Sequence, residues 1–184
     1  MRKVIFQNMI TLDGFFAGPQ GQIDWHEVDE EFNEYAIGVL DQIDTLLFGR
    51  VTYELMANYW STDMALSDDP IVAGKMNALD KVVFSRSLDQ AAWSHSRLVK
   101  GDAVEEVGRL KKLSGKDMAI FGSADLAKAL IASDLVDEYH IFINPIVLGS
   151  GLPLFKEMKK PLKLKLVDSK IFKNGLVLLV YDPK

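Results

Sequence analysis

The sequence predicts a three-layer α/β/α fold whose central sheet is mostly parallel and closes with a C-terminal antiparallel hairpin. Short apolar runs of strand length alternate with segments of helical periodicity, which is the pattern of right-handed crossovers onto a parallel sheet. Apolar residues make up 48% of the 184 residues, enough to cover such a sheet on both faces. Near the end of the chain, two β-type runs flank Asn174 and Gly175, a strong hairpin turn. We expect one domain over residues 1–184, because no repeat or linker divides the chain.

The first half of the chain begins with a buried strand and a glycine-rich loop. The opening run is β-branched and apolar, and three glycines and a proline then interrupt it. From Asp29, apolar residues recur at helical spacing, and two glutamates occupy the first turn, where the helix dipole favours them. The elements expected in this half are strands over 3–12 and 45–48, helices over 29–43, 50–59 and 71–79, and irregular segments over 13–21 and 64–70.

The second half alternates strands with helices until the hairpin. A helix is expected where Val104, Val107 and Leu110 share one face, and another where Leu126 and Leu130 do so. The expected strands are 81–84, 97–99, 118–121 and 136–143, the expected helices are 102–113 and 123–132, and the hairpin strands are 162–172 and 176–181.

The composition excludes several classes of function. The chain has 21 basic and 26 acidic side chains and a formal net charge of -5, so we expect no nucleic-acid partner. It has no cysteine, which excludes disulfides, thiolate zinc sites, iron–sulfur clusters and cysteine nucleophiles. The three histidines have no partner at metal-ligand spacing, so no metal is expected. Because no apolar stretch approaches the ~20 residues of a membrane span and no signal-peptide core is present, we expect a cytoplasmic protein without a membrane partner.

Two strand–glycine–helix turns are the main candidates for a ligand site. In the first, a buried strand ends at Gly49 and a helix starts at once, so Arg50 and Thr52 lie beside helix amides that suit a phosphate. Gly122 and Ser123 form the second turn of this kind. Ligands bind at the carboxyl ends of parallel strands, so the pair predicts one shared ligand. The alternative is two plain turns, one with a surface arginine and one with a serine cap.

A third strand end carries Ser85 and Arg86, followed by another serine. A planar guanidinium with flanking hydroxyls suits the 2′-phosphate of NADPH, which would favour NADPH over NADH. The alternative interpretation is a solvated arginine in a loop.

The loop after the first strand carries carboxylates and aromatic residues. Asp13 and Asp24 could orient ring nitrogens or a ribose hydroxyl, while Trp25 covers a flat heterocycle. Alternatively, Asp13 stabilises the turn and Trp25 packs beneath it. Asp29 either caps the following helix or faces an interior cleft, and capping is the commoner outcome.

A second loop, over residues 144–155, follows the strand expected over 136–143. It holds two prolines together with Gly149 and Gly151, and apolar side chains lie between them. This loop either lines the substrate or cofactor cleft through its amides, or serves as a structural crossover or a dimer surface.

In their order along the chain these motifs resemble the dihydrofolate reductase superfamily. The branch they most resemble is the reductase domain of bacterial riboflavin-biosynthesis deaminase/reductases and its stand-alone relatives. The resemblance covers essentially the whole chain. Its motifs are T-L-D-G-F-F-A-G after the first strand, G-R-V-T-Y-E, F-S-R-S, F-G-S and P-I-V-L-G-S-G-L-P-L-F.

The resemblance implies an NADPH cofactor and hydride transfer to a pterin-like or aminopyrimidine-ribosylamine substrate. It also implies a homodimer. The implied cofactor-binding residues are Gly14, Gly49, Arg50, Thr52, Ser85, Arg86, Gly122, Ser123 and Leu126. The implied substrate-binding residues are Trp25, Asn33, Gly149 and Gly151, and the candidate catalytic carboxylates are Asp13, Asp24 and Asp29.

Two departures from the resemblance narrow the expected activity. Dihydrofolate reductase uses a carboxylate on its first helix, and counting back from Gly49 puts Asn33 near that place, so we do not expect dihydrofolate as the substrate. The chain also has neither the room nor the cysteines for a zinc deaminase domain. The rival hypotheses are a nucleotide-binding protein of the same fold without turnover and a pure interaction module.

Overall fold

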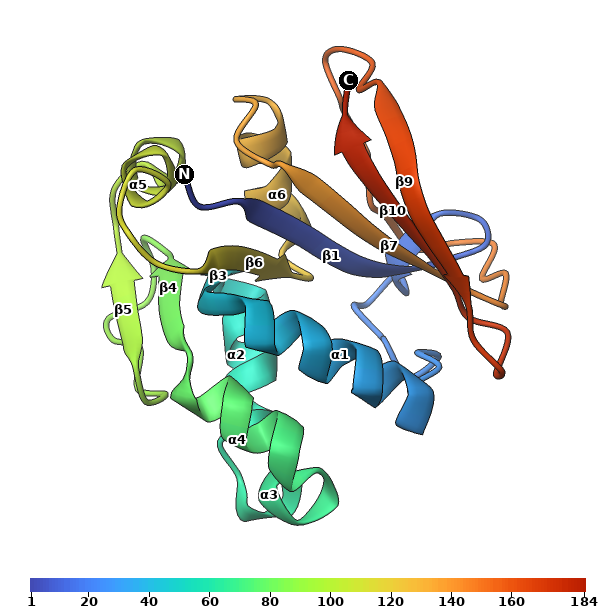
Figure 1. Ribbon diagram of the computed structural model, residues 1–184, viewed down its shortest axis with the longest axis horizontal. Coiled ribbons are helices and arrows are strands. Elements are labelled where there is room, and N and C mark those ends of the chain that lie inside the picture. The colour runs from blue at the N-terminus through green and yellow to red at the C-terminus, as the bar shows by residue number, and fades with distance from the viewer.

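The computed structural model describes residues 1–184 and contains an eight-stranded sheet with helices on both faces (Figure 1). Its strands are β1 (Val4–Thr11), β3 (Ile43–Gly49), β4 (Asp80–Phe84), β5 (Ser96–Val99), β6 (Asp117–Phe121), β7 (Glu138–Asn144), β9 (Leu164–Ile171) and β10 (Val177–Pro183). They lie in the order β5-β4-β3-β6-β1-β7-β10-β9. All pairs from β5 to β7 are parallel, and β10 is antiparallel to both of its neighbours. The predicted mostly parallel sheet with a C-terminal antiparallel pair is confirmed.

The helices are α1 (Glu30–Gln42), α2 (Arg50–Trp60), α3 (Asp63–Asp68), α4 (Pro70–Ala78), α5 (Ala103–Leu110) and α6 (Ala124–Ile131). Helices α5 and α6 cover one face of the sheet, and α1, α2 and α4 cover the other (Figure 1). Each face therefore has its own apolar cluster. The largest cluster includes Val107 and Leu130 beneath α5 and α6, and the second includes Leu40, Tyr53 and Met76 beneath the other helices.

The C-terminal hairpin adds a third apolar cluster and one free edge. Phe172, Leu176 and Leu178 pack with Met9 and Phe142 on the side of the sheet where α1 begins. The hairpin turns at Gly175, whose φ of +91° is the left-handed conformation that glycine adopts without strain. Strand β9 is the outermost strand on this side of the sheet, and most of its residues are exposed.

Two expectations about irregular segments are wrong. Residues 64–70 were expected to be irregular, but they contain most of α3, which starts where Thr62 Oγ1 accepts the Ala65 N–H at 3.3 Å. The loop expected over 13–21 contains a short strand, β2 (Phe15–Ala17), which pairs antiparallel with β8 (Leu152–Pro153). The other elements begin and end within a few residues of expectation. The largest difference is at α5, which was expected to end at residue 113 and ends at Leu110.

The carboxyl ends of the parallel strands meet at one edge of the sheet, and this edge is stepped. Gln7 of β1 pairs with Phe121, the last residue of β6. Strands β1 and β7 continue side by side as far as the pair Thr11 and Asn144. The turn after β6 therefore lies beside the middle of β1. No helix of the structure combines the length and apolarity needed to cross a bilayer.

Candidate functional site

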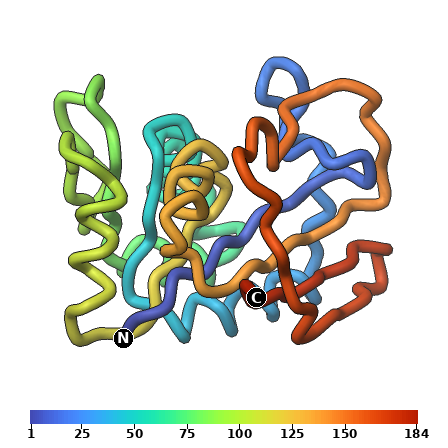
Figure 2. The backbone as a smooth tube through the Cα atoms, turned by 90° about the horizontal axis from the view of Figure 1, so that it is seen from above, coloured from blue at the N-terminus to red at the C-terminus, as the bar shows by residue number.

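The two strand–glycine–helix turns lie side by side and are hydrogen-bonded to each other. The Gly49 N–H donates to Ser123 Oγ at 3.0 Å, and the Ser123 N–H donates to Thr52 Oγ1 at 3.0 Å. The helices themselves leave these turns on opposite faces of the sheet (Figure 1), so α2 (turquoise) and α6 (gold) overlap when the sheet is viewed from above in Figure 2. Because β3 and β6 are neighbours in the sheet, residues far apart in sequence form one surface at the carboxyl edge.

The second turn has a backbone conformation that favours glycine. Gly122 has a φ of +68°, and a Cβ placed on it would lie 3.1 Å from Thr52 Cγ2. The Gly122 N–H donates to the Gln7 carbonyl at 3.2 Å, and its own carbonyl accepts from Asn8 Nδ2 at 3.2 Å. Ser123 follows with a φ of +30°, also in the left-handed region. The turn is thus held against both β1 and α2.

Helices α2 and α6 differ from the other helices in having no side-chain cap. The starts of α1, α3, α4 and α5 are each capped by a side-chain oxygen, from Asp29, Thr62, Asp69 and Asp102 respectively. At α6 the Ser123 hydroxyl is turned toward Gly49, and at α2 the cap position is Gly49 itself. The first amides of both helices keep their hydrogen-bonding capacity and the positive end of the helix dipole, which suits an anion.

Two arginines lie next to this surface, and only one of them forms an ion pair. Arg50 Nη1 forms an ion pair with Glu54 Oε2 at 2.8 Å, and both side chains are exposed. Arg86 is exposed and makes no ion pair. Ser85 Oγ accepts the N–H groups of Ser87 and Leu88 at 3.2 and 3.1 Å, which bends the chain just beyond the end of β4. Since β4 pairs with β3, this bend holds Arg86 one strand away from Gly49.

Asp13 ties the loop after β1 to the loop after β7. Its carboxylate accepts hydrogen bonds from Thr11 Oγ1 at 2.6 Å and from the N–H groups of Leu148 and Gly149 at 3.2 and 2.7 Å. The Thr11 hydroxyl, followed by these backbone amides, holds the pKa of the Asp13 carboxyl below its usual value. In this structure Asp13 is an anionic acceptor that positions two loops.

Glycines allow these two loops to approach closely. Gly14 and Gly149 have φ values of +86° and +74°. A Cβ on Gly151 would lie 2.5 Å from the Ala17 carbonyl oxygen and 2.9 Å from the Phe15 ring, so only glycine fits there. The pairing of β2 with β8 completes the contact. Residues 11–17 and 145–153 therefore form one unit beyond the ends of β1 and β7, as the neighbouring blue and orange segments in Figure 2 show.

The remaining predicted residues lie in the segment between β2 and α1 and in the first turn of α1. Asp29 Oδ1 accepts the Phe32 N–H at 2.9 Å and caps α1, the commoner of the two outcomes expected for it. Asp24 is exposed, and the half-buried Trp25 donates from Nε1 to the Gln22 carbonyl at 3.2 Å. Asn33 is half-buried on α1. The three candidate carboxylates thus have separate surroundings, and no cluster of acidic and histidine side chains in the structure could hold a metal ion.

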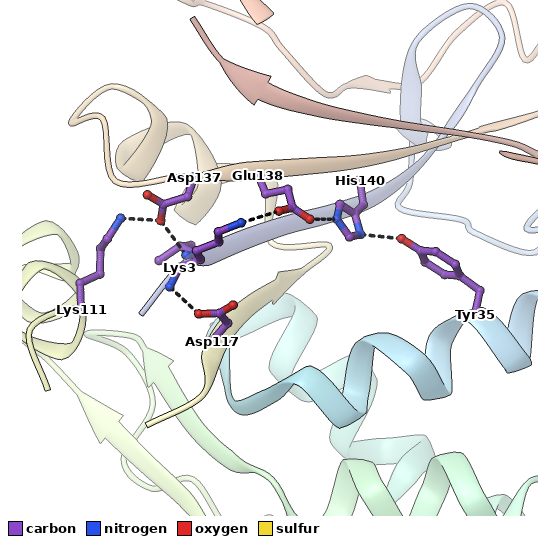
Figure 3. A network of polar contacts seen from close by, with 8 residues as sticks. Lys3, Tyr35, Lys111, Asp117, Asp137, Glu138 and His140 are labelled. Atoms are coloured by element: carbon purple, nitrogen blue, oxygen red, sulfur yellow. Dashed lines mark hydrogen bonds and ion pairs between the residues drawn. The ribbon is translucent and has the colours of Figure 1, made fainter. Parts of the chain in front are cut away.

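Sequence reasoning missed a chain of polar contacts beneath α1 (Figure 3). Lys3 Nζ contacts Glu138 Oε2 at 3.2 Å, Glu138 Oε1 contacts His140 Nε2 at 2.5 Å, and His140 Nδ1 contacts the Tyr35 hydroxyl at 2.7 Å. The hydrogen bond to His140 holds the pKa of Glu138 below its usual value, and burial raises the pKa of Tyr35. The available signal was the alternation of Glu138 and His140 along a strand, which places both on one face of the sheet.

Sequence reasoning also missed Asn144, which holds the loop before α1 in place. It is fully buried at the end of β7. Its Oδ1 accepts the Glu27 N–H at 2.9 Å, and its Nδ2 donates to the Ile10 carbonyl at 3.2 Å. One side chain therefore fixes the loop before α1 to the end of β1.

A comparison with protein families matches residues 2–178 to the RibD C-terminal domain. The chain belongs to this family. The chain is also similar to the uncharacterized protein YyaP of Bacillus subtilis, with 35% identity over 186 residues that cover 98% of this chain and 94% of YyaP. The resemblance found in the sequence motifs is thereby confirmed.

Solved structures of other proteins have the same fold as this chain. A putative riboflavin biosynthesis protein from a Shewanella species superposes with a TM-score of 0.73 and 26% identity over 99% of both chains. A dihydrofolate reductase from Enterococcus faecalis, complexed with NADP(H) and RAB-propyl, has a TM-score of 0.65 and 17% identity over 99% of this chain and 96% of its own. The fold is that of dihydrofolate reductase.

Proposed function

We propose that this chain is an NADPH-dependent reductase that transfers hydride to a pterin-like or aminopyrimidine-ribosylamine substrate. The observation that carries the proposal is the pair of uncapped helix starts, joined through Ser123 at the carboxyl edge of the sheet. Such a pair supplies several free amides and two helix dipoles to one diphosphate group. The RibD C-terminal family and a fold shared with a reductase that binds NADP(H) support this choice of ligand.

The residues at this edge fit NADPH. The backbone of Gly49 to Thr52 and of Gly122 to Leu126 would hold the diphosphate; the Leu126 side chain is buried in the core, so only its amide takes part. An exposed ion pair such as that of Arg50 with Glu54 contributes only about 0.3–0.5 kcal/mol, so the guanidinium is easily redirected to a phosphate. When bound, NADPH supplies a hydride from its nicotinamide ring.

The adenosine and nicotinamide ends of the cofactor would contact different loops. Ser85 and Arg86 would hold the 2′-phosphate, because the guanidinium is exposed and makes no ion pair. Gly14, held in place by the Asp13 hydrogen bonds, would face the nicotinamide.

The proposed substrate-binding residues are Trp25, Asn33, Gly149 and Gly151. Asp13 and Asp29 have positioning roles, which leaves Asp24 as the candidate carboxylate without a hydrogen-bond partner. The homodimer and the cytoplasmic location also remain proposals, and sedimentation of the purified protein tests the first of these.

Titration calorimetry with NADPH and NADH tests the proposal. Arg86→Ala should weaken NADPH binding about 10- to 100-fold, the usual effect of losing a charge-assisted hydrogen bond, and should change NADH binding little. Arg109→Ala is the matched control, because Arg109 is exposed and pairs with Glu106 on α5. Equal losses for both cofactors would remove the 2′-phosphate assignment. Absence of NADPH binding at levels well above micromolar would refute the reductase.

The rival function, nucleotide binding without turnover, makes a different prediction. It requires NADPH binding without NADPH oxidation across a panel of pterins and aminopyrimidine ribosides. Oxidation of NADPH with any member of that panel, followed at the nicotinamide absorbance, supports the reductase.

A further inference from the structure

Gln7 is a polar side chain in the middle of β1, where the other two polar side chains, Asn8 and Thr11, have hydrogen-bond partners. Its Oε1 is buried and has no hydrogen-bond partner. Leaving a buried acceptor unpaired is unfavourable, and almost all such groups in folded proteins are paired. Gln7 as a whole is only half-buried, so part of its side chain is reachable from outside. The unpaired oxygen therefore calls for a functional explanation.

Neither strand neighbour of Gln7 can satisfy this oxygen. Gln7 pairs with Phe121 of β6 on one side and with His140 of β7 on the other. Phe121 is apolar. Both nitrogens of His140 are already occupied, Nε2 by Glu138 and Nδ1 by the Tyr35 hydroxyl, as Figure 3 shows. His140 therefore has no free nitrogen to donate a hydrogen bond to Gln7.

Gln7 lies beside the candidate site, at the level of the turn that holds Gly122. The Gln7 carbonyl accepts the Gly122 N–H at 3.2 Å, so its side chain lies level with the turn after β6. Alternation along β1 puts Gln7 on the face of Ile5 and Met9, beneath α1. These two residues belong to different apolar clusters, and Gln7 lies at the boundary between them. The half-buried ring of Phe121 lies beside it.

We propose that Gln7 recognises the edge of the substrate heterocycle. Rotation of the carboxamide brings the buried Oε1 to the accessible side of Gln7, where Oε1 accepts a hydrogen bond from a ring N–H, Nε2 donates to the adjacent ring carbonyl, and Phe121 contacts the ring. A carboxamide can do both at once, since it carries an acceptor and two donors. The ligand class is a planar heterocycle with neighbouring N–H and C=O groups, such as a uracil ring. The inference rests on the proposed function, because the heterocycle is the substrate of that site.

Calorimetry with 5,6-diaminouracil, with and without NADP⁺, tests this assignment. The 1,3-dimethyl derivative, which lacks both ring N–H groups, is the matched ligand. Gln7→Leu should weaken 5,6-diaminouracil binding about 10-fold, which corresponds to the loss of about 1.4 kcal/mol of hydrogen bonding. The same variant should raise Tm by about 2–4 °C, because it removes an unpaired buried oxygen. Gln42→Leu, at an exposed glutamine near the end of α1, should change neither quantity.

The outcomes separate this inference from the reductase proposal. Weaker binding together with a higher Tm supports the role of Gln7. Unchanged affinity in Gln7→Leu, equal affinity of the parent protein for both uracils, no binding of 5,6-diaminouracil at millimolar concentrations, or a fall in Tm overturns it. Failure of NADPH to bind the parent protein refutes the reductase alone, since 5,6-diaminouracil binding is measured without cofactor as well.

Discussion

Replacing Gly122 with alanine should weaken both folding and cofactor binding. Gly122 has a φ of +68°, and the new Cβ would lie 3.1 Å from Thr52 Cγ2. Thr52 is also the residue whose Oγ1 accepts the Ser123 N–H at 3.0 Å. The added methyl group therefore pushes on the side chain that joins the two glycine turns, and it displaces the amides proposed to hold the diphosphate.

Two separate costs set the magnitude. A left-handed backbone costs an L-residue roughly 1–2 kcal/mol, and an overpacked contact adds about 1–3 kcal/mol, so Gly122→Ala should lose about 2–5 kcal/mol of unfolding free energy. At about 2–4 °C per kcal/mol for a chain of this size, Tm falls by on the order of 10 °C. Thr52→Ser removes the methyl group and keeps the hydroxyl. The double variant Gly122→Ala with Thr52→Ser should therefore regain the free energy lost to the overpacked contact, while the loss from the left-handed backbone remains.

Urea denaturation and NADPH calorimetry on the same variants measure both effects. Gly108→Ala, the control, makes the same change inside α5, where nothing lies within 4 Å of the new Cβ. It should gain about 0.5–1 kcal/mol, because alanine is the better helix former. The reasoning is refuted if Gly122→Ala unfolds at the parent's urea concentration, or if Thr52→Ser gives no recovery in the double variant.

Three further predictions concern other polar groups. Burial lowers the pKa of His26 to about 4, below its unfolded value, so unfolding free energy measured in urea should be constant above about pH 6.5 and fall by up to about 3 kcal/mol toward pH 4. Tyr35→Phe leaves His140 Nδ1 buried without its hydrogen-bond partner, and should lower the unfolding free energy by about 1–3 kcal/mol. Asp13→Asn places a side-chain NH2 group, which cannot accept a hydrogen bond, where Asp13 Oδ2 accepts the Gly149 N–H. Hydrogen exchange of the Gly149 N–H should therefore become faster.

Matched variants control each of these three measurements. His95→Asn replaces an exposed histidine with a residue that tolerates its positive φ, and should keep the acid dependence that His26→Gln removes. Tyr139→Phe, at a buried tyrosine with no hydroxyl hydrogen bond, should be close to neutral. Asp24→Asn, at an exposed carboxylate, should leave exchange unchanged. A pH profile identical in His26→Gln and the parent would exclude His26 as the titrating group.

Local patterns were enough to predict the long strands, most helices and the glycine turns, because these depend on periodicity and on single residues that end an element. The short helix α3 escaped prediction because its six residues are too few to show a period. The pairing of β2 with β8 escaped because it joins segments more than a hundred positions apart, and no local signal specifies such a partner.

The candidate site shows the same division between local and long-range information. Gly49 and Gly122 were identified from their own neighbours in sequence. The roles of Ser123 and Thr52 depend on β3 lying next to β6, and the unpaired state of Gln7 depends on its alignment with His140. Strand order and register are long-range properties, so the sequence could name Thr52 and Ser123 without showing what they contact, and it did not single out Gln7.

The double hydrogen bond of Ser123 also limits how the protein can change over generations. One serine accepts from position 49 and donates to position 52, although it is 74 and 71 positions away from them. A substitution at 52 that removes the hydroxyl leaves the Ser123 N–H without its acceptor, and a substitution at 123 leaves the Gly49 N–H without one. Substitutions at positions 49, 52 and 123 should therefore covary during evolution, because each position depends on the hydrogen bonds of the others.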